Sequence, residues 1–100
     1  MSLSITKNIS DKTEIILDGR LDTTTAPELE AVLEEVLPST KDLVLDFAKL
    51  EYISSAGLRL VLKSKKSMDA AGGTMKLVNV CDEIMEVFDI TGFSDFLTIE

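Results

Sequence analysis

Two consecutive serines followed by small residues have the clearest chemical potential in this sequence. Ser54 and Ser55 precede Ala56 and Gly57, where a run of apolar residues with helical spacing begins. A serine at a helix start can accept hydrogen bonds from free backbone N–H groups, which is a structural role. The same N–H groups and the positive end of the helix dipole favour an anion, including a phosphate esterified to the serine. Because Ala56 and Gly57 are small and leave the serine hydroxyl accessible, the pattern also suits a phosphorylation switch.

The composition excludes most catalytic chemistry at these serines. The 100 residues include no histidine and a single cysteine, Cys81. A Ser-His-Asp triad, a Cys-His pair and most zinc sites all need an imidazole. The glycines form neither of the phosphate-binding patterns GxxxxGK[ST] and GxGxxG. We therefore predict a protein that is not an enzyme and that uses neither a metal nor a cofactor.

A hydrolase with Ser55 as its nucleophile is the alternative from a different class. It would need a lysine or carboxylate base within hydrogen-bond reach. Leu58 stands where a Ser-x-x-Lys pattern would place the lysine. A burst of product from an activated ester, lost in Ser55→Ala, would identify such an enzyme.

Charge and hydropathy indicate a cytoplasmic protein. The net charge is -8, and the one short basic cluster, Lys63, Lys65 and Lys66, falls near the end of a predicted helix, where cations favour the dipole. We therefore expect no direct binding of nucleic acid. No apolar run approaches the roughly 18 residues of a membrane span, so we expect no insertion into a membrane. The lone Cys81 excludes an internal disulfide and suits a reducing compartment.

The elements before the serines follow from the spacing of apolar residues. Residues 3–9 and 13–17 alternate like two strands, and the turn between them predicts antiparallel pairing. Residues 25–28 fit a capping box that opens a helix, and Pro38 closes its far end. The apolar stripe of this helix is Leu29, Val32, Leu33, Val36 and Leu37.

The serines themselves fall between a predicted strand and a predicted helix. Residues 43–47 are almost continuously apolar, which predicts a central strand buried on both faces. After a loop around Glu51, a second helix is expected from about Ala56 to Ala71, with Gly72-Gly73 as its left-handed stop. The serines then lie at the start of this helix.

The rest of the chain completes an α/β domain. We expect a strand over residues 75–80, a helix that begins near Asp82 and ends at Gly92, and an edge strand over residues 96–99. The order β-β-α-β-α-β-α-β predicts right-handed crossovers between parallel strands. The fold class is therefore a single layer of mixed, mainly parallel sheet, with four to five strands packed against helices. Residues 1–100 form one domain.

Two loops of this fold are candidates for a functional site. Sites in open α/β sheets form where loops leave the carboxyl ends of strands and enter helices. Residues 18–25 lead into the first helix and residues 50–58 into the second.

At these residues the chain resembles the STAS-domain anti-sigma factor antagonists of bacteria, and the likeness extends over nearly all of its length. The family signature is an acidic strand end, then a spacer, then Asp-Ser-Ser/Thr-Gly-Leu at the start of the second helix. Residues 45–47 and 53–59 occupy these places here, and residues 19–22 match the Gly-x-Leu-Asp stretch of the family. The family's phosphorylated serine falls on Ser55 and its glycine on Gly57.

Two positions depart from the family pattern. Ser54 stands where the best-known members have aspartate, and Ala56 where they have serine or threonine. Ser54 is therefore a rival phosphate acceptor to Ser55.

The resemblance implies partner switching in a protein that is a monomer when free. The unphosphorylated form would bind an anti-sigma factor that is also a serine kinase, and so release the sigma factor. Phosphorylation of Ser55 by that kinase would reverse the binding, and a serine phosphatase would restore it. ATP and Mg²⁺ would belong to the kinase. The expected partner-binding surface is Asp22, Thr24, Ser54, Ser55, Ala56, Gly57 and Leu58.

Two alternatives stay open at this point. Asp22 serves equally well as a carboxylate that favours the nearby helix N-terminus. The second alternative concerns the whole chain, which would then be a STAS-like docking module of another assembly, such as a lipid-transport, transporter-linked or stress-sensing complex. In that case the Ser55 surface would bind its partner without phosphorylation.

Overall fold

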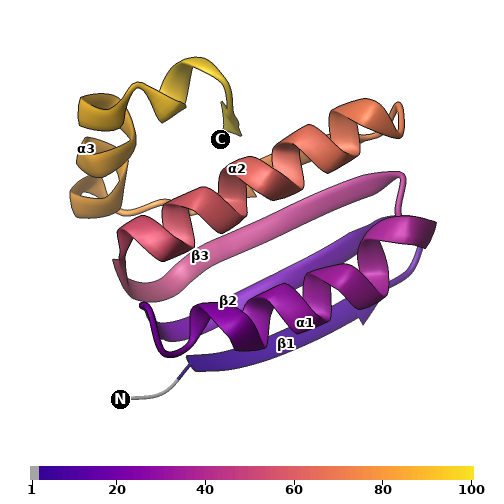
Figure 1. The fold of residues 1–100 in the computed structure, drawn as a ribbon, viewed down its shortest axis with the longest axis horizontal. Coiled ribbons are helices and arrows are strands. Elements are labelled where there is room, and N and C mark those ends of the chain that lie inside the picture. Colours follow the sequence, from indigo (N-terminus) through magenta and orange to yellow (C-terminus); the bar gives the residue numbers. More distant parts are fainter. Residues whose placement is uncertain (1–2) are drawn as a thin grey trace.

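The structure is a computed structural model that describes residues 3–100, and it has the predicted order of elements (Figure 1). The strands and α-helices are β1 (Leu3–Ile9), β2 (Thr13–Leu21), α1 (Ala26–Val36), β3 (Asp42–Ile53), α2 (Ser55–Ala70), β4 (Thr74–Val78), α3 (Asp82–Thr91) and β5 (Thr98–Ile99). Two 3₁₀ turns, η1 (Leu37–Ser39) and η2 (Phe93–Asp95), follow α1 and α3. No helix in residues 3–100 has the length and apolar character needed to cross a membrane.

The strands form one mixed sheet in the spatial order β1-β2-β3-β4-β5. β1 and β2 are joined by a short turn and are antiparallel, whereas the β2–β3, β3–β4 and β4–β5 pairs are parallel. Each parallel pair is connected through a helix, as a crossover requires. The predicted mixed, mainly parallel sheet is confirmed, with five strands.

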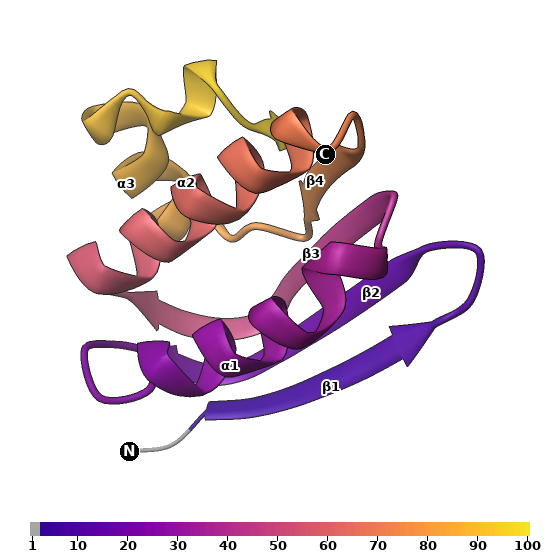
Figure 2. The same ribbon diagram turned by 45° about the vertical axis from the view of Figure 1, so that its right-hand side comes forward.

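All three helices contribute to one core on one face of the sheet. In Figures 1 and 2, α1 and α2 lie side by side across that face. Ile15 and Leu45 point into the core and are fully buried. α3 joins the same core through Phe88, whose ring stacks on Phe47 of β3 with 6.3 Å between centroids.

The opposite face of the sheet carries no helix in the described part of the chain. The predicted burial of residues 43–47 on both faces is largely confirmed, although the helices cover only one of the two faces. Val44 is still only 3% exposed, because the register of the central strand places it between Glu14 and Lys76. Asp46, on the same face, is half-buried.

Strands β2 and β3 are longer than predicted, and this changes the candidate loops. Residues 18–21 and the segment around Glu51 were expected to be loop, but the strands continue to Leu21 and Ile53, which pair with each other. The pairing shifts register twice on the way, and Gly19 has a φ of +118°. Such irregularities break the period-two alternation that identifies a strand in a sequence. The connections from β2 to α1 and from β3 to α2 are therefore short.

The predicted capping box at residues 25–28 is wrong. The hydroxyl of Thr25 accepts from the N–H of Asp22 at 2.8 Å and donates to the carbonyl of Arg20 at 2.8 Å. It makes no hydrogen bond to the N–H groups of α1, because it is already engaged by the preceding loop.

Most other boundaries differ from prediction by one or two residues. Gly72 and Gly92 adopt left-handed φ values of +73° and +80° and end α2 and α3 as expected. β4 ends at Val78, because Asn79 has a φ of +59° that an extended strand cannot continue. The last strand is shorter than expected, since η2 occupies the segment before it.

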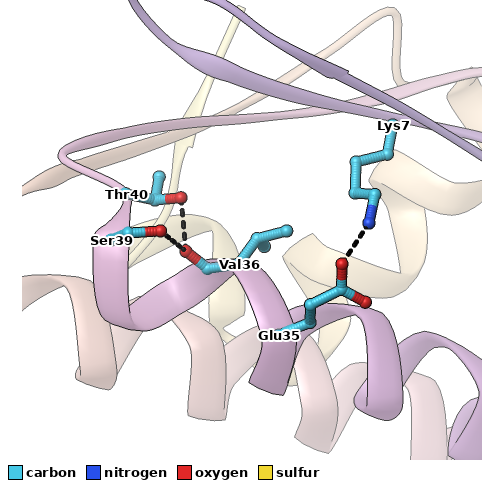
Figure 3. Close-up of polar contacts among 5 residues, drawn as sticks. All are labelled: Lys7, Glu35, Val36, Ser39 and Thr40. Atoms are coloured by element: carbon cyan, nitrogen blue, oxygen red, sulfur yellow. Dashed lines mark hydrogen bonds and ion pairs between the residues drawn. The ribbon is translucent and has the colours of Figure 1, made fainter.

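Polar contacts link the C-terminal end of α1 to the sheet (Figure 3). The buried hydroxyl of Thr40 donates to the carbonyl of Val36 at 2.6 Å and lies 3.0 Å from the hydroxyl of Thr13 on β2. On the exposed side, Lys7 of β1 pairs with Glu35 of α1. These contacts hold α1 across β1 and β2, with its N-terminus at the carboxyl end of β2.

Candidate functional site

The two candidate loops meet at one end of the sheet, where β2 and β3 end and α1 and α2 begin (Figure 1). Only residues 22–25 separate β2 from α1, and only Ser54 separates β3 from α2. The N–H of Ser54 donates to the carbonyl of Leu21 at 2.8 Å, which ties the two connections together. The predicted residues Asp22, Thr24, Ser54 and Ser55 thus come from neighbouring segments.

Ser54 is the N-cap of α2. Its backbone is extended (φ −94°, ψ 174°), and its hydroxyl accepts from the N–H of Gly57 at 3.3 Å. Its carbonyl accepts from the N–H of Leu58 at 2.9 Å. The Ser54 side chain is half-buried and has a structural role at the start of the helix.

Ser55 is the first residue of α2 and is exposed. Within residues 3–100 its hydroxyl has no hydrogen-bond partner. It lies on the first turn of the helix, where the backbone N–H groups lack intrahelical acceptors and the dipole favours an anion. Ser55, the predicted phosphate acceptor, and its rival Ser54 therefore differ in burial and in bonding.

Gly57 and Leu58 are buried in the interior. A Cβ atom at Gly57 would lie 2.8 Å from Cγ of Leu21 and 2.9 Å from Cγ1 of Ile53, so this glycine permits close packing of α2 on the strand ends. Leu58 is 7% exposed and belongs to the core. The accessible part of the predicted surface is accordingly formed by the other five residues: Asp22, Thr24, Ser54, Ser55 and Ala56.

Asp22 organises the loop before α1. Its Oδ1 accepts from the N–H groups of Thr24 at 3.0 Å and Thr25 at 3.1 Å, and from the Thr24 hydroxyl at 2.7 Å. These hydrogen bonds, the one from the Thr24 hydroxyl foremost, lower the pKa of the Asp22 carboxyl below its ordinary value. At neutral pH the site thus holds a fixed negative charge close to α2.

An aromatic–cation pair beside the serines was not predicted. The guanidinium of Arg20 lies 4.2 Å from the ring centroid of Tyr52, and the two residues are paired across β2 and β3. Tyr52 is 40% exposed. Tyrosine and arginine are both enriched at the energetic centres of protein interfaces. The sequence shows a tyrosine two residues before Ser54. It does not show that Arg20 lies beside this tyrosine, because that depends on the register between β2 and β3.

A shallow groove runs between the first turns of α1 and α2, next to Ser55. Its volume is about 260 Å³. It is lined by Thr23, Ala26, Pro27, Glu30, Ala56, Arg59, Leu60 and Lys63. Across its rim, Lys63 pairs with Glu30 at 3.0 Å, which raises the pKa of Lys63. In the described residues no cluster of three or more His, Cys, Asp or Glu side chains could hold a metal ion.

Comparison with known proteins identifies the family. The STAS domain profile matches residues 4–100. The anti-sigma-B factor antagonist of Staphylococcus aureus is 32% identical over 101 residues, which cover 99% of this chain and 94% of that protein. The chain belongs to the STAS-domain family of anti-sigma factor antagonists.

Solved STAS-domain structures have the same fold. An anti-sigma factor antagonist from Mycobacterium paratuberculosis superposes with a TM-score of 0.87 at 21% identity, over 97% of this chain and 84% of that one. The Bacillus cell fate determinant SpoIIAA in its phosphorylated form gives 0.76 at 20% identity, over 98% and 90% of the two chains. The five-stranded sheet with three helices is thus the STAS fold.

Proposed function

We propose that this STAS-domain protein is an anti-sigma factor antagonist switched by phosphorylation of Ser55. The unphosphorylated form binds an anti-sigma factor that is also a serine kinase, and the sigma factor is released. Transfer of the γ-phosphoryl group of ATP to Ser55 ends the binding, and a serine phosphatase restores it. Because the cycle uses ATP, it operates in the cytoplasm.

The proposal rests on the difference in hydrogen bonding and exposure between the two serine side chains. Ser54 caps α2 through the N–H of Gly57, whereas the Ser55 hydroxyl is exposed and unbonded within residues 3–100. A kinase must reach a hydroxyl that is free to attack the γ-phosphorus atom. Ser55 meets this requirement without any loss of helix capping. One Bacillus protein with this fold, SpoIIAA, is known in a phosphorylated form, which supports phosphorylation as the switch.

Electrostatics explains how one phosphate would end the binding. The phosphate adds a charge of about −1.5 to −2 at pH 7. It joins the ionised Asp22 carboxylate in the neighbouring connection. A partner surface suited to a neutral serine hydroxyl beside one carboxylate would then face two anions, and a charge left unpaired at an interface costs several kcal/mol.

The test is a phosphorylation assay with the serine kinase encoded nearest to the gene of this protein. The purified chain is incubated with this kinase and Mg-ATP, and intact and fragment masses are measured. We expect a gain of about 80 Da, one phosphate, on Ser55. Ser55→Ala should abolish the gain, and Ser54→Ala should retain it.

Two other results would change the proposal. Phosphate on Ser54 would keep the switch but reject the assignment based on the free hydroxyl. Tight binding of the kinase without phosphate transfer would reject the phosphorylation switch and favour a docking module that binds its partner passively.

A further inference from the structure

Arg59 is a cation of α2 without an ionic partner in the described residues. Lys63 pairs with Glu30 at 3.0 Å, and Lys65 pairs with Asp69 at 2.8 Å. Arg59 is exposed and lies at the rim of the groove between α1 and α2. No carboxylate in residues 3–100 lies within salt-bridge distance of it.

Arg59 lies about one helical turn after Ser55. Residues four apart on a helix lie on the same face, with about 5–6 Å between their Cβ atoms. Ser55 is the first residue of α2 and Arg59 follows four residues later. An anion placed N-terminal to a cation in this spacing is the more favourable orientation of such a pair.

The groove beside Arg59 offers this side chain no carboxylate that is free to pair with it. Ala56 and Pro27 line the groove with small, apolar surface, and Glu30 is already paired with Lys63. No described side chain therefore holds Arg59 by charge. A guanidinium also offers several N–H donors in a planar fork that matches phosphate oxygens, which an ammonium does not.

We propose that Arg59 binds the phosphate of phosphorylated Ser55 within the same chain, a step that rests on the proposed modification. The phosphate is then held from two sides, by the first-turn N–H groups of α2 that Ser54 leaves free and by the guanidinium one turn later. Phosphorylation changes two features of the partner surface at once. It adds an anion at Ser55, and it withdraws from the groove a cation that was free for a partner.

The experiment measures the second pKa of the phosphate, about 6 in an unperturbed phosphoserine. Phosphoserine is installed at position 55 during translation, so no kinase is required. The ³¹P resonance is followed from pH 4 to 8 at 0.15 M salt in the otherwise wild-type chain, Arg59→Gln, Arg59→Lys and Lys66→Gln. Lys66 is the matched control: it is exposed, unpaired in residues 3–100, on the same helix and of the same charge. It lies eleven residues from Ser55, about 16 Å along the helix and beyond the screening length of about 8 Å.

We expect Arg59→Gln to raise the second pKa by about 0.2–0.4 units, the shift that a helical ion pair of ordinary strength produces. Arg59→Lys should give a smaller rise, and Lys66→Gln less than about 0.1 unit. Equal shifts in the Arg59→Gln and Lys66→Gln proteins would overturn the proposal, because only general electrostatics would then act. Since Arg59 is exposed, its variants should fold, which circular dichroism checks. Failure of the kinase to modify Ser55 would show in the earlier assay and would not move these values.

Discussion

Ser54 and Ser55 show how adjacent residues of one type acquire different roles. The half-buried Ser54 hydroxyl accepts from the N–H of Gly57. The Ser55 side chain, one residue further, points to solvent and has no bond within the described chain. The first serine therefore contributes to stability, and the second is available for modification.

Alanine substitutions should separate the two roles. Ser54→Ala removes the cap of α2 and should lower the free energy of unfolding by about 0.5–2 kcal/mol. Ser55→Ala removes an exposed, unbonded hydroxyl and should change it by less than about 0.5 kcal/mol. Urea denaturation of both proteins and of wild type provides the measurement. A larger loss for Ser55→Ala than for Ser54→Ala would contradict the assigned roles.

Asp22 makes a pH-dependent contribution at the same site. Hydrogen bonds from Thr24 and Thr25 lower its pKa in the folded protein below the ordinary value. The stabilisation is therefore fully present above the unfolded pKa of about 3.9, and it is lost as the pH falls through the lower folded value. We expect Asp22→Ala to lower the urea midpoint at pH 7, and the difference from wild type to shrink as the pH falls through and below the folded pKa of Asp22. A difference that stays constant over this range would show that the ionised carboxylate is not responsible.

At the scale of elements, the site depends on how closely α2 approaches the ends of β2 and β3. Gly57 makes this approach possible, because its missing side chain leaves space for Leu21 and Ile53. The sequence predicted both strands but ended them too early, since the register shifts between β2 and β3 interrupt the alternation of apolar residues. Residues 18–21 and 51–53, expected to be loop, instead belong to paired strands that end directly before Asp22 and Ser54.

Gly57→Ala tests this packing. Alanine is the better helix former by about 1 kcal/mol. Its Cβ would nevertheless lie 2.8 Å from Cγ of the fully buried Leu21, which cannot move freely. Overpacking of this kind costs about 1–3 kcal/mol, so after the helix-propensity gain we expect a net loss of up to about 2 kcal/mol in the free energy of unfolding. Ser67→Ala, at an exposed position of the same helix, is the control and should be nearly neutral. A Gly57→Ala protein more stable than this control by the full helix-propensity gain of about 1 kcal/mol would refute the close packing.

At the scale of the whole molecule, the parallel sheet assembles the site. β2 and β3 are parallel neighbours, so their carboxyl ends lie at the same edge of the sheet. This brings residues 22–25 together with residues 54–59, about thirty positions later. The three helices lie on one face, and the starts of α1 and α2 lie together at this edge of the sheet. Because the net charge is −8, a partner that binds this surface must also tolerate an acidic protein.

The order of the elements, the mixed sheet and the place of the serines at a helix start could all be read from the sequence. They depend on local periodicity, on glycine and proline signals and on the length of the connections, and these are properties of neighbouring residues. Which serine hydroxyl is free, why Gly57 must be glycine, and the pairing of Arg20 with Tyr52 required the tertiary structure. These features depend on strand register and on distances between segments far apart in the chain, and no local pattern specifies either quantity.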